Sequence, residues 1–118
     1  MRVVGLTYPD VYLGAWVSSA ADGRAVAADS VGFFRNVLNP ALRDRYTAAG
    51  ATFVDVTAVT GGYGPLTDTV ADGRYGTLPV PVARVCALTF YCSRSDPHPT
   101  TDGYTAIANE VLIAAGVS

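Results

Sequence analysis

Apolar and polar positions in the first half of the chain follow two different periods. Residues 2–8 (RVVGLTY) form a nearly continuous apolar run that stops at Pro9, which is typical of a strand buried on both faces of a parallel sheet. Residues 51–57 (ATFVDVT) form a second apolar run. Between them, the apolar side chains of residues 27–49 fall at helical spacing. The order strand, helix, strand predicts a βαβ unit.

Three positions shape the predicted helix at 27–49. Asn39 followed by Pro40 combines a good N-cap with a good first helical residue, so we expect either two consecutive helices or one kinked helix. Gly50 stands where a C-terminal glycine belongs. Asp29 and Ser30 lie just before Val31, the first large apolar residue of the helical pattern, where such residues commonly cap a helix.

The second half of the chain is less regular. Residues 58–80 contain seven Gly or Pro and predict a long loop of the kind that often carries function. Residues 81–92 fit either a short strand or a helix. The apolar spacing of the last segment predicts an amphipathic helix that follows Thr100 or Thr101 and stops at Gly116.

Composition narrows the class of protein. The chain has 118 residues, half of them apolar, which is enough for one domain over residues 1–118 and too few for two. A net charge of −2 without a run of like charges argues against nucleic acid or an anionic membrane as partner. The absence of lysine removes Schiff-base chemistry and the P-loop. No segment approaches the roughly 20 apolar residues of a membrane span, and Pro9 and Asp10 break the N-terminal run before it could serve as a signal peptide.

Two cysteines, Cys86 and Cys92, lie six positions apart. This spacing suits a disulfide that closes a short loop, and a disulfide would place the chain in an oxidising compartment. A metal site formed by both cysteines and His98 would match no familiar zinc spacing. Since no Gly-x-Gly-x-x-Gly follows either predicted strand, we predict neither a metal nor a dinucleotide cofactor.

The segment RSDPHPTTDGYTAIA, residues 94–108, holds the one histidine of the chain. Pro97 and Pro99 flank His98 and favour extended backbone at their neighbours. In extended backbone, alternate residues share a face with Cα atoms roughly 6.6 Å apart, so the Asp96 carboxylate can reach the imidazole. Such a carboxylate would orient the ring as a general base. The alternative is a loop histidine without chemistry, with Asp96 as a turn residue.

This segment, with the βαβ unit before it, resembles the C-terminal half of an SGNH (GDSL-type) esterase or lipase, closest to the actinobacterial secreted branch. The stretches AGATFVDVT, RVCALTFYC and HPTTDGYTAIA stand in the order of that branch. The resemblance implies a three-layer α/β/α flavodoxin-like (SGNH hydrolase-like) sheet, truncated at its N-terminal side. It also implies secretion, no metal or other cofactor, and hydrolysis of carboxylic esters. His98 would be the general base and Asp96 the carboxylate that orients it.

The chain departs from the family pattern at the nucleophile. The Gly-Asp-Ser block that carries the catalytic serine, and the Gly and Asn blocks of the oxyanion hole, would all precede Met1. Asp29-Ser30 echoes Gly-Asp-Ser only weakly, and its position favours a cap. The family also usually places two residues between its Asp and His, whereas only Pro97 intervenes here. We therefore expect either a fragment or a site assembled in another way.

Two functions from different classes follow. The first is an ester hydrolase that takes a small-molecule ester as substrate and uses Asp96 and His98 to activate a serine. The second is a catalytically silent α/β fragment or interaction module that keeps the histidine loop. The unpaired edge of the strand at 2–8 also predicts a homo-oligomer, or a complementing N-terminal half as partner.

Overall fold

The computed structural model describes residues 2–116 and has a mixed α/β fold. Strands β1 (Val4–Leu6) and β2 (Thr52–Val54) pair in parallel. Backbone bonds from the Thr52 amide to the Val3 carbonyl, 2.9 Å, and from the Thr7 amide to the Val54 carbonyl, 3.2 Å, extend the ladder at both ends. The predicted βαβ order and parallel pairing are therefore confirmed, with strands shorter than predicted.

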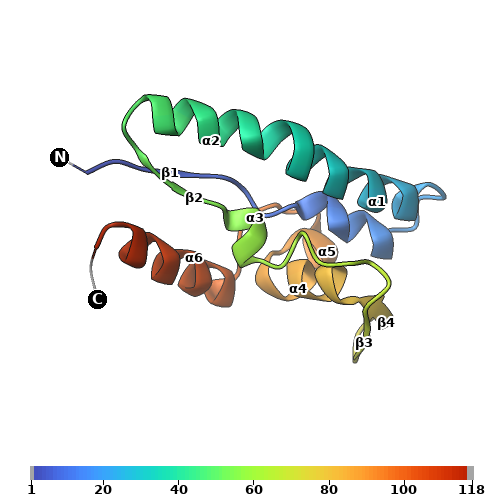
Figure 1. Cartoon of the computed structure of the whole chain (residues 1–118). Coiled ribbons are helices and arrows are strands. Elements are labelled where there is room, and N and C mark those ends of the chain that lie inside the picture. The colour runs from blue at the N-terminus through green and yellow to red at the C-terminus, as the bar shows by residue number, and fades with distance from the viewer. Residues whose placement is uncertain (1, 117–118) are drawn as a thin grey trace.

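One continuous helical run connects the two strands (Figure 1). It consists of α1 (Gly23–Phe33), the π-helical turn η2 (Phe34–Leu38) and α2 (Asn39–Ala48). The π turn lies directly before Pro40, because proline lacks an amide proton and its ring crowds the carbonyl four residues earlier. Of the two predicted forms, the single interrupted helix is the one observed.

The end of this run was predicted better than its caps. Gly50 has φ +81° and donates its amide to the Thr47 carbonyl at 3.0 Å, so the predicted C-terminal glycine is confirmed. The predicted caps are wrong. Asp29 and Ser30 lie inside α1, which begins at Gly23, and Asn39 has helical backbone angles with no capping hydrogen bond.

Short elements follow the two strands. The 3-10 helix η1 (Val11–Val17), which was not predicted, packs against α1. Helix α3 (Val56–Val59) begins almost directly after β2, because the Asp55 carboxylate accepts the Ala58 amide at 3.1 Å and caps it.

The segment predicted as a long loop contains an antiparallel hairpin. Strands β3 (Thr69–Asp72) and β4 (Gly76–Pro79) pair in it, so the loop prediction is wrong there. The Asp72 carboxylate accepts the amides of Arg74 and Tyr75 at 2.8 and 3.1 Å and holds the turn.

The remainder of the chain is helical. Residues 81–92 resolve into α4 (Val80–Leu88) and α5 (Tyr91–Arg94). Helix α6 (Thr101–Ala114) ends the described chain, and Thr100 caps it by accepting the Gly103 amide at 3.2 Å, as predicted. Figure 1 shows α2 on one side of the two strands and α6 on the other, and both helices contact β2.

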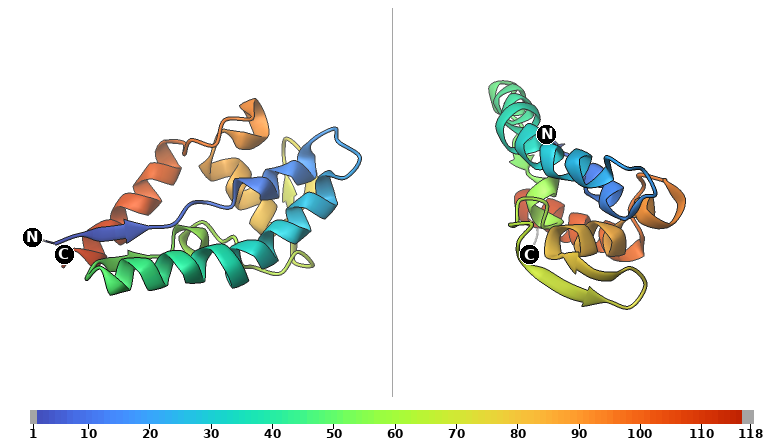
Figure 2. Two further views of the ribbon diagram at one scale, coloured as in Figure 1. Left: turned by 90° about the horizontal axis from the view of Figure 1, so that it is seen from above. Right: turned by 90° about the vertical axis from the view of Figure 1, so that its right-hand side faces the viewer.

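The hydrophobic core lies toward one end of an elongated molecule. Its buried residues come from η1, α1, β4 and α4, and they are Leu13, Ala27, Leu78, Val82 and Val85. The chain measures 46 × 28 × 24 Å along its principal axes, and β1 and β2 extend away from this core toward the two termini (Figure 2). Within residues 2–116, none of the helices has the length and apolar character that a membrane crossing requires.

Candidate functional site

Backbone hydrogen bonds attach the histidine loop to the end of α4. The Phe90 amide donates to the His98 carbonyl at 3.0 Å, and the Thr100 amide donates to the Leu88 carbonyl at 2.9 Å. Thr89 and Pro99 form an isolated antiparallel bridge between these two bonds. The backbone on both sides of the imidazole is therefore held in place.

A disulfide and a glycine support the same corner. Cys86 and Cys92 are disulfide-bonded, with Cα atoms 5.1 Å apart, and the bond ties α4 to α5 on either side of Phe90. Such bonds are typical of proteins from oxidising compartments. At Gly103, an added Cβ would lie 2.1 Å from the Leu88 carbonyl oxygen. The first turn of α6 can approach α4 this closely only because that position is glycine.

The structure brings Asp96 and His98 together. The His98 Nδ1 and an Asp96 carboxylate oxygen are 2.6 Å apart, and the same oxygen accepts the His98 backbone amide at 2.9 Å. These bonds, first that from the backbone amide and then that from the ring, hold the pKa of Asp96 below its usual value. An ionised carboxylate only accepts hydrogen bonds, so Nδ1 is the donor and the neutral ring has its unprotonated nitrogen at Nε2.

His98 lines an apolar groove that runs beside β1. The groove has a volume of about 590 Å³, and its walls come from β1 and its flanks, from Tyr46, from Ile107 and from the histidine loop. Tyr8 and Pro97 separate it from a smaller hollow of about 230 Å³ that Tyr12 and Phe34 also line. The imidazole side chain is 73% exposed and the Asp96 side chain 40%. A small molecule in the groove can therefore reach the ring.

Ser30, the weak candidate nucleophile, lies elsewhere. It is buried in α1, where its hydroxyl lies 2.6 Å from an Asp10 carboxylate oxygen and 2.7 Å from the Ala27 carbonyl. The Ser93 hydroxyl donates a hydrogen bond to the Phe90 carbonyl, at 3.4 Å. Among the residues from 2 to 116, no hydroxyl hydrogen-bonds to the His98 ring. No serine in this part of the chain is therefore placed as a nucleophile by a hydrogen bond to the His98 ring.

A polar network that sequence reasoning missed supports the wall of the groove. The Tyr63 hydroxyl donates to the Asp55 carboxylate at 2.8 Å, and the Asn39 amide donates to the Thr57 hydroxyl at 2.9 Å. The Thr57 hydroxyl in turn donates to the Tyr8 carbonyl at 2.6 Å. Burial, together with the Asp55 carboxylate, raises the pKa of the Tyr63 phenol. The sequence signal for it was Asp55, at the carboxyl end of a parallel strand, where polar residues often converge.

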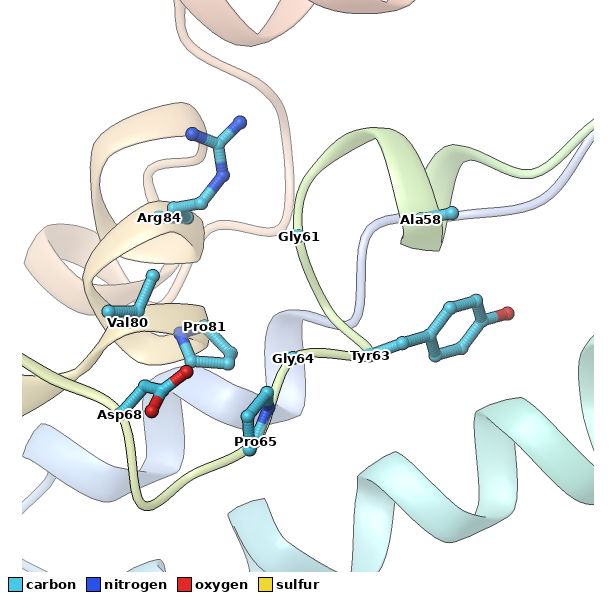
Figure 3. A pocket seen from close by; sticks show the side chains of 9 residues that line it. All are labelled: Ala58, Gly61, Tyr63, Gly64, Pro65, Asp68, Val80, Pro81 and Arg84. Carbon is cyan, nitrogen blue, oxygen red and sulfur yellow. The ribbon is translucent and has the colours of Figure 1, made fainter.

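Another hollow, of about 320 Å³, lies between the glycine-rich segment and α4 (Figure 3). Its charged side chains are Asp68 and Arg84. The ring of Tyr63 points away from it, toward the network described above (Figure 3). Because neither Asp96 nor His98 lines this hollow, we place the candidate site at the groove beside β1.

Neither a cluster of metal ligands nor a related protein identifies the function of this site. Within residues 2–116, no three His, Cys, Asp or Glu side chains gather closely enough to hold a metal ion. Comparison with protein-family models, with curated proteins and with solved structures found no match to this chain. The function must therefore be argued from the site itself.

Proposed function

We propose that the chain carries the base of a carboxylic ester hydrolase of SGNH (GDSL) type, in which Asp96 and His98 activate a serine nucleophile. The observation that carries this proposal is the 2.6 Å contact between Asp96 and His98 Nδ1 at the side of an apolar groove. That contact leaves Nε2 as the nitrogen that accepts a proton. It is the relation between carboxylate and imidazole that acyl transfer uses.

In the proposed reaction, Nε2 of His98 accepts the proton of the serine hydroxyl as its oxygen attacks the ester carbonyl. Asp96 stabilises the imidazolium that results. The imidazolium then gives its proton to the departing alcohol, and water hydrolyses the acyl-enzyme with the same base. The serine itself is unassigned. The apolar lining of the groove supports a small ester of low polarity as substrate.

The proposal includes a fold and a compartment. We place the chain in a three-layer α/β/α flavodoxin-like sheet, supported by α2 and α6 on the two sides of β1 and β2. We place the protein outside the cell, supported by the Cys86–Cys92 disulfide. The proposed reaction uses no metal and no other cofactor.

Hydrolysis of p-nitrophenyl acetate tests the proposal. Loss of a general base costs about 10²- to 10⁴-fold in rate, so we expect His98→Ala and Asp96→Asn to lower kcat/KM by that order. Asp102→Asn is the matched control, because Asp102 lies in the first turn of α6 and makes no hydrogen bond to His98. Equal rates for wild type and His98→Ala would contradict the mechanism.

A catalytically silent α/β module is the second candidate. It is favoured by the lack of a hydroxyl on the His98 ring among residues 2–116, and each missing oxyanion donor costs about 3–4 kcal/mol of transition-state stabilisation. A fluorophosphonate probe separates the two candidates. A stoichiometric adduct on a serine supports the hydrolase, and the absence of any adduct supports the silent module.

A further inference from the structure

One edge of β1 has no strand beside it in the described structure. The sheet consists of β1 and β2 alone within residues 2–116. The bonds of Val3 and Thr7 to β2 show that the backbone of odd-numbered residues faces β2. By strand alternation, the amides and carbonyls of Val4 and Leu6 point to the other edge, where the Tyr46 hydroxyl donates to the Leu6 carbonyl at 3.1 Å.

Of the features that protect natural edge strands, this edge has only its shortness, since β1 is three residues long. Such edges usually carry charges, proline or a bulge, but none of the residues 3–8 is charged or a proline. Val3, Tyr8 and Tyr12, which line the two hollows beside β1, are 56%, 66% and 50% exposed. An uncharged, apolar surface therefore flanks the outward backbone groups of Val4 and Leu6. The Leu6 carbonyl already accepts the Tyr46 hydroxyl, and another strand can pair the others.

The chain as a whole exposes more surface than a compact monomer of its mass. A folded monomer of 12.3 kDa exposes about 6,100 Å², whereas this chain exposes 6876 Å². The excess of several hundred Å² is of the same order as the roughly 800 Å² that each partner buries in an interface of standard size.

We propose that this surface binds a second copy of the chain, with the two β1 strands antiparallel across a two-fold axis. The self-complementary character of the surface favours a second copy, because an uncharged edge meets its own image without charge repulsion. The result is a four-stranded sheet in the order β2-β1-β1-β2, with α2 next to α2 and α6 next to α6.

The pairing does not rest on ester hydrolysis, although Val4 and Leu6 line the same groove as His98. The pairing lies at Val4–Leu6, whereas His98 lies just before α6, whose first turn is near the carboxyl ends of the strands in both Figure 1 and Figure 2. In the dimer, the second β1 strand therefore covers the part of the groove that Val4 and Leu6 line and narrows the space open to a substrate beside His98.

Size-exclusion chromatography with light scattering tests the proposal, and we expect a mass of twice 12.3 kDa. Val4→Pro removes an outward amide and leaves the ladder to β2 unchanged, since edge strands tolerate proline where the amide faces solvent. Val3→Lys places a charge in the interface. We expect each variant to keep its far-UV circular dichroism and to raise Kd by roughly tenfold or more. Val70→Lys, on the exposed hairpin strand β3, is the matched control and should remain dimeric.

Hydrogen exchange gives a second readout. The Val4 and Leu6 amides should exchange slowly in the dimer and faster in Val3→Lys at the same concentration. A monomer at every concentration would overturn the proposal. A dimer that Val4→Pro and Val3→Lys leave equally tight would overturn it as well.

Discussion

Asp10 and Ser30 form a buried hydrogen-bonded pair. When the Asp10 carboxyl is ionised, the pair has a single hydroxyl proton for two acceptors. The Ser30 hydroxyl has one proton and two acceptors within reach, an Asp10 oxygen at 2.6 Å and the Ala27 carbonyl at 2.7 Å. Asp10 is fully buried, and its other oxygen has no hydrogen-bond partner. Both contacts are satisfied when a protonated Asp10 donates to Ser30, and Ser30 donates to Ala27.

This pair makes stability depend on pH. Burial raises the pKa of Asp10 above 3.8, so the folded state holds this proton more tightly than the unfolded state. The stabilisation is fully present below pH 3.8 and is lost as pH rises through the folded pKa. Asp10→Asn keeps a donor to Ser30 at every pH. We expect it to raise the free energy of unfolding at pH 7 by about 1 kcal/mol and to flatten its pH dependence, as measured by urea unfolding.

The control for this substitution is Asp44→Asn, because the Asp44 side chain is 75% exposed and its change should alter stability little. If Asp10→Asn is less stable than wild type at pH 7, the buried carboxylate is tolerated in its ionised form. That result would contradict the protonated pair.

At the scale of elements, replacing glycine by alanine is expected to have opposite effects on stability at Gly103 and at Gly32. An added Cβ at Gly103 would lie 2.1 Å from the Leu88 carbonyl oxygen and 2.9 Å from the Pro99 Cβ. At Gly32, in α1, the nearest atom would be an Asn36 side-chain nitrogen 4.0 Å away. The first glycine sets the distance between α6 and α4, and the second only weakens its helix.

Gly103→Ala should therefore destabilise the protein by about 1–3 kcal/mol, because the backbone of α4 must move. Gly32→Ala should stabilise it by up to about 1 kcal/mol, because alanine is the better helix former. Thermal unfolding followed by circular dichroism measures both. Equal effects of the two substitutions would contradict the close contact of α6 with α4 at Gly103.

The elements that could be predicted are those with local causes. Hydrophobic periodicity gave the helical run, and glycine and threonine chemistry gave its end at Gly50 and the start of α6 after Thr100. Asn39 was misassigned, because its usual role as a cap was displaced by a tertiary hydrogen bond to Thr57. The hairpin at 69–79 was missed, because glycine and proline obscure strand spacing.

At the scale of the molecule, the packing is uneven. The radius of gyration is 14.7 Å, above the value of about 13.5 Å for a folded chain of this length. The core lies around α4 and η1, while β1 and β2 form a narrow sheet in which, within residues 2–116, no third strand pairs with β1. An elongated shape of this kind is consistent with the proposed dimer, in which a second copy of the chain packs beside β1.

The pairing within the candidate site was predictable, whereas its surroundings were not. Asp96 and His98 are two residues apart, and two prolines restrict the backbone around them, so their contact is a local property. The groove and the network around Tyr63 bring together residues that are tens of positions apart. Apolar spacing along one chain contains little information about such contacts.

Nitrogen-15 NMR of the single histidine tests the central claim most directly, because its ring signals need no assignment. The account predicts that the neutral ring has its proton on Nδ1 and that Asp96→Asn shifts the ring toward the other tautomer. A neutral ring protonated mainly at Nε2, with no change in Asp96→Asn, would contradict it.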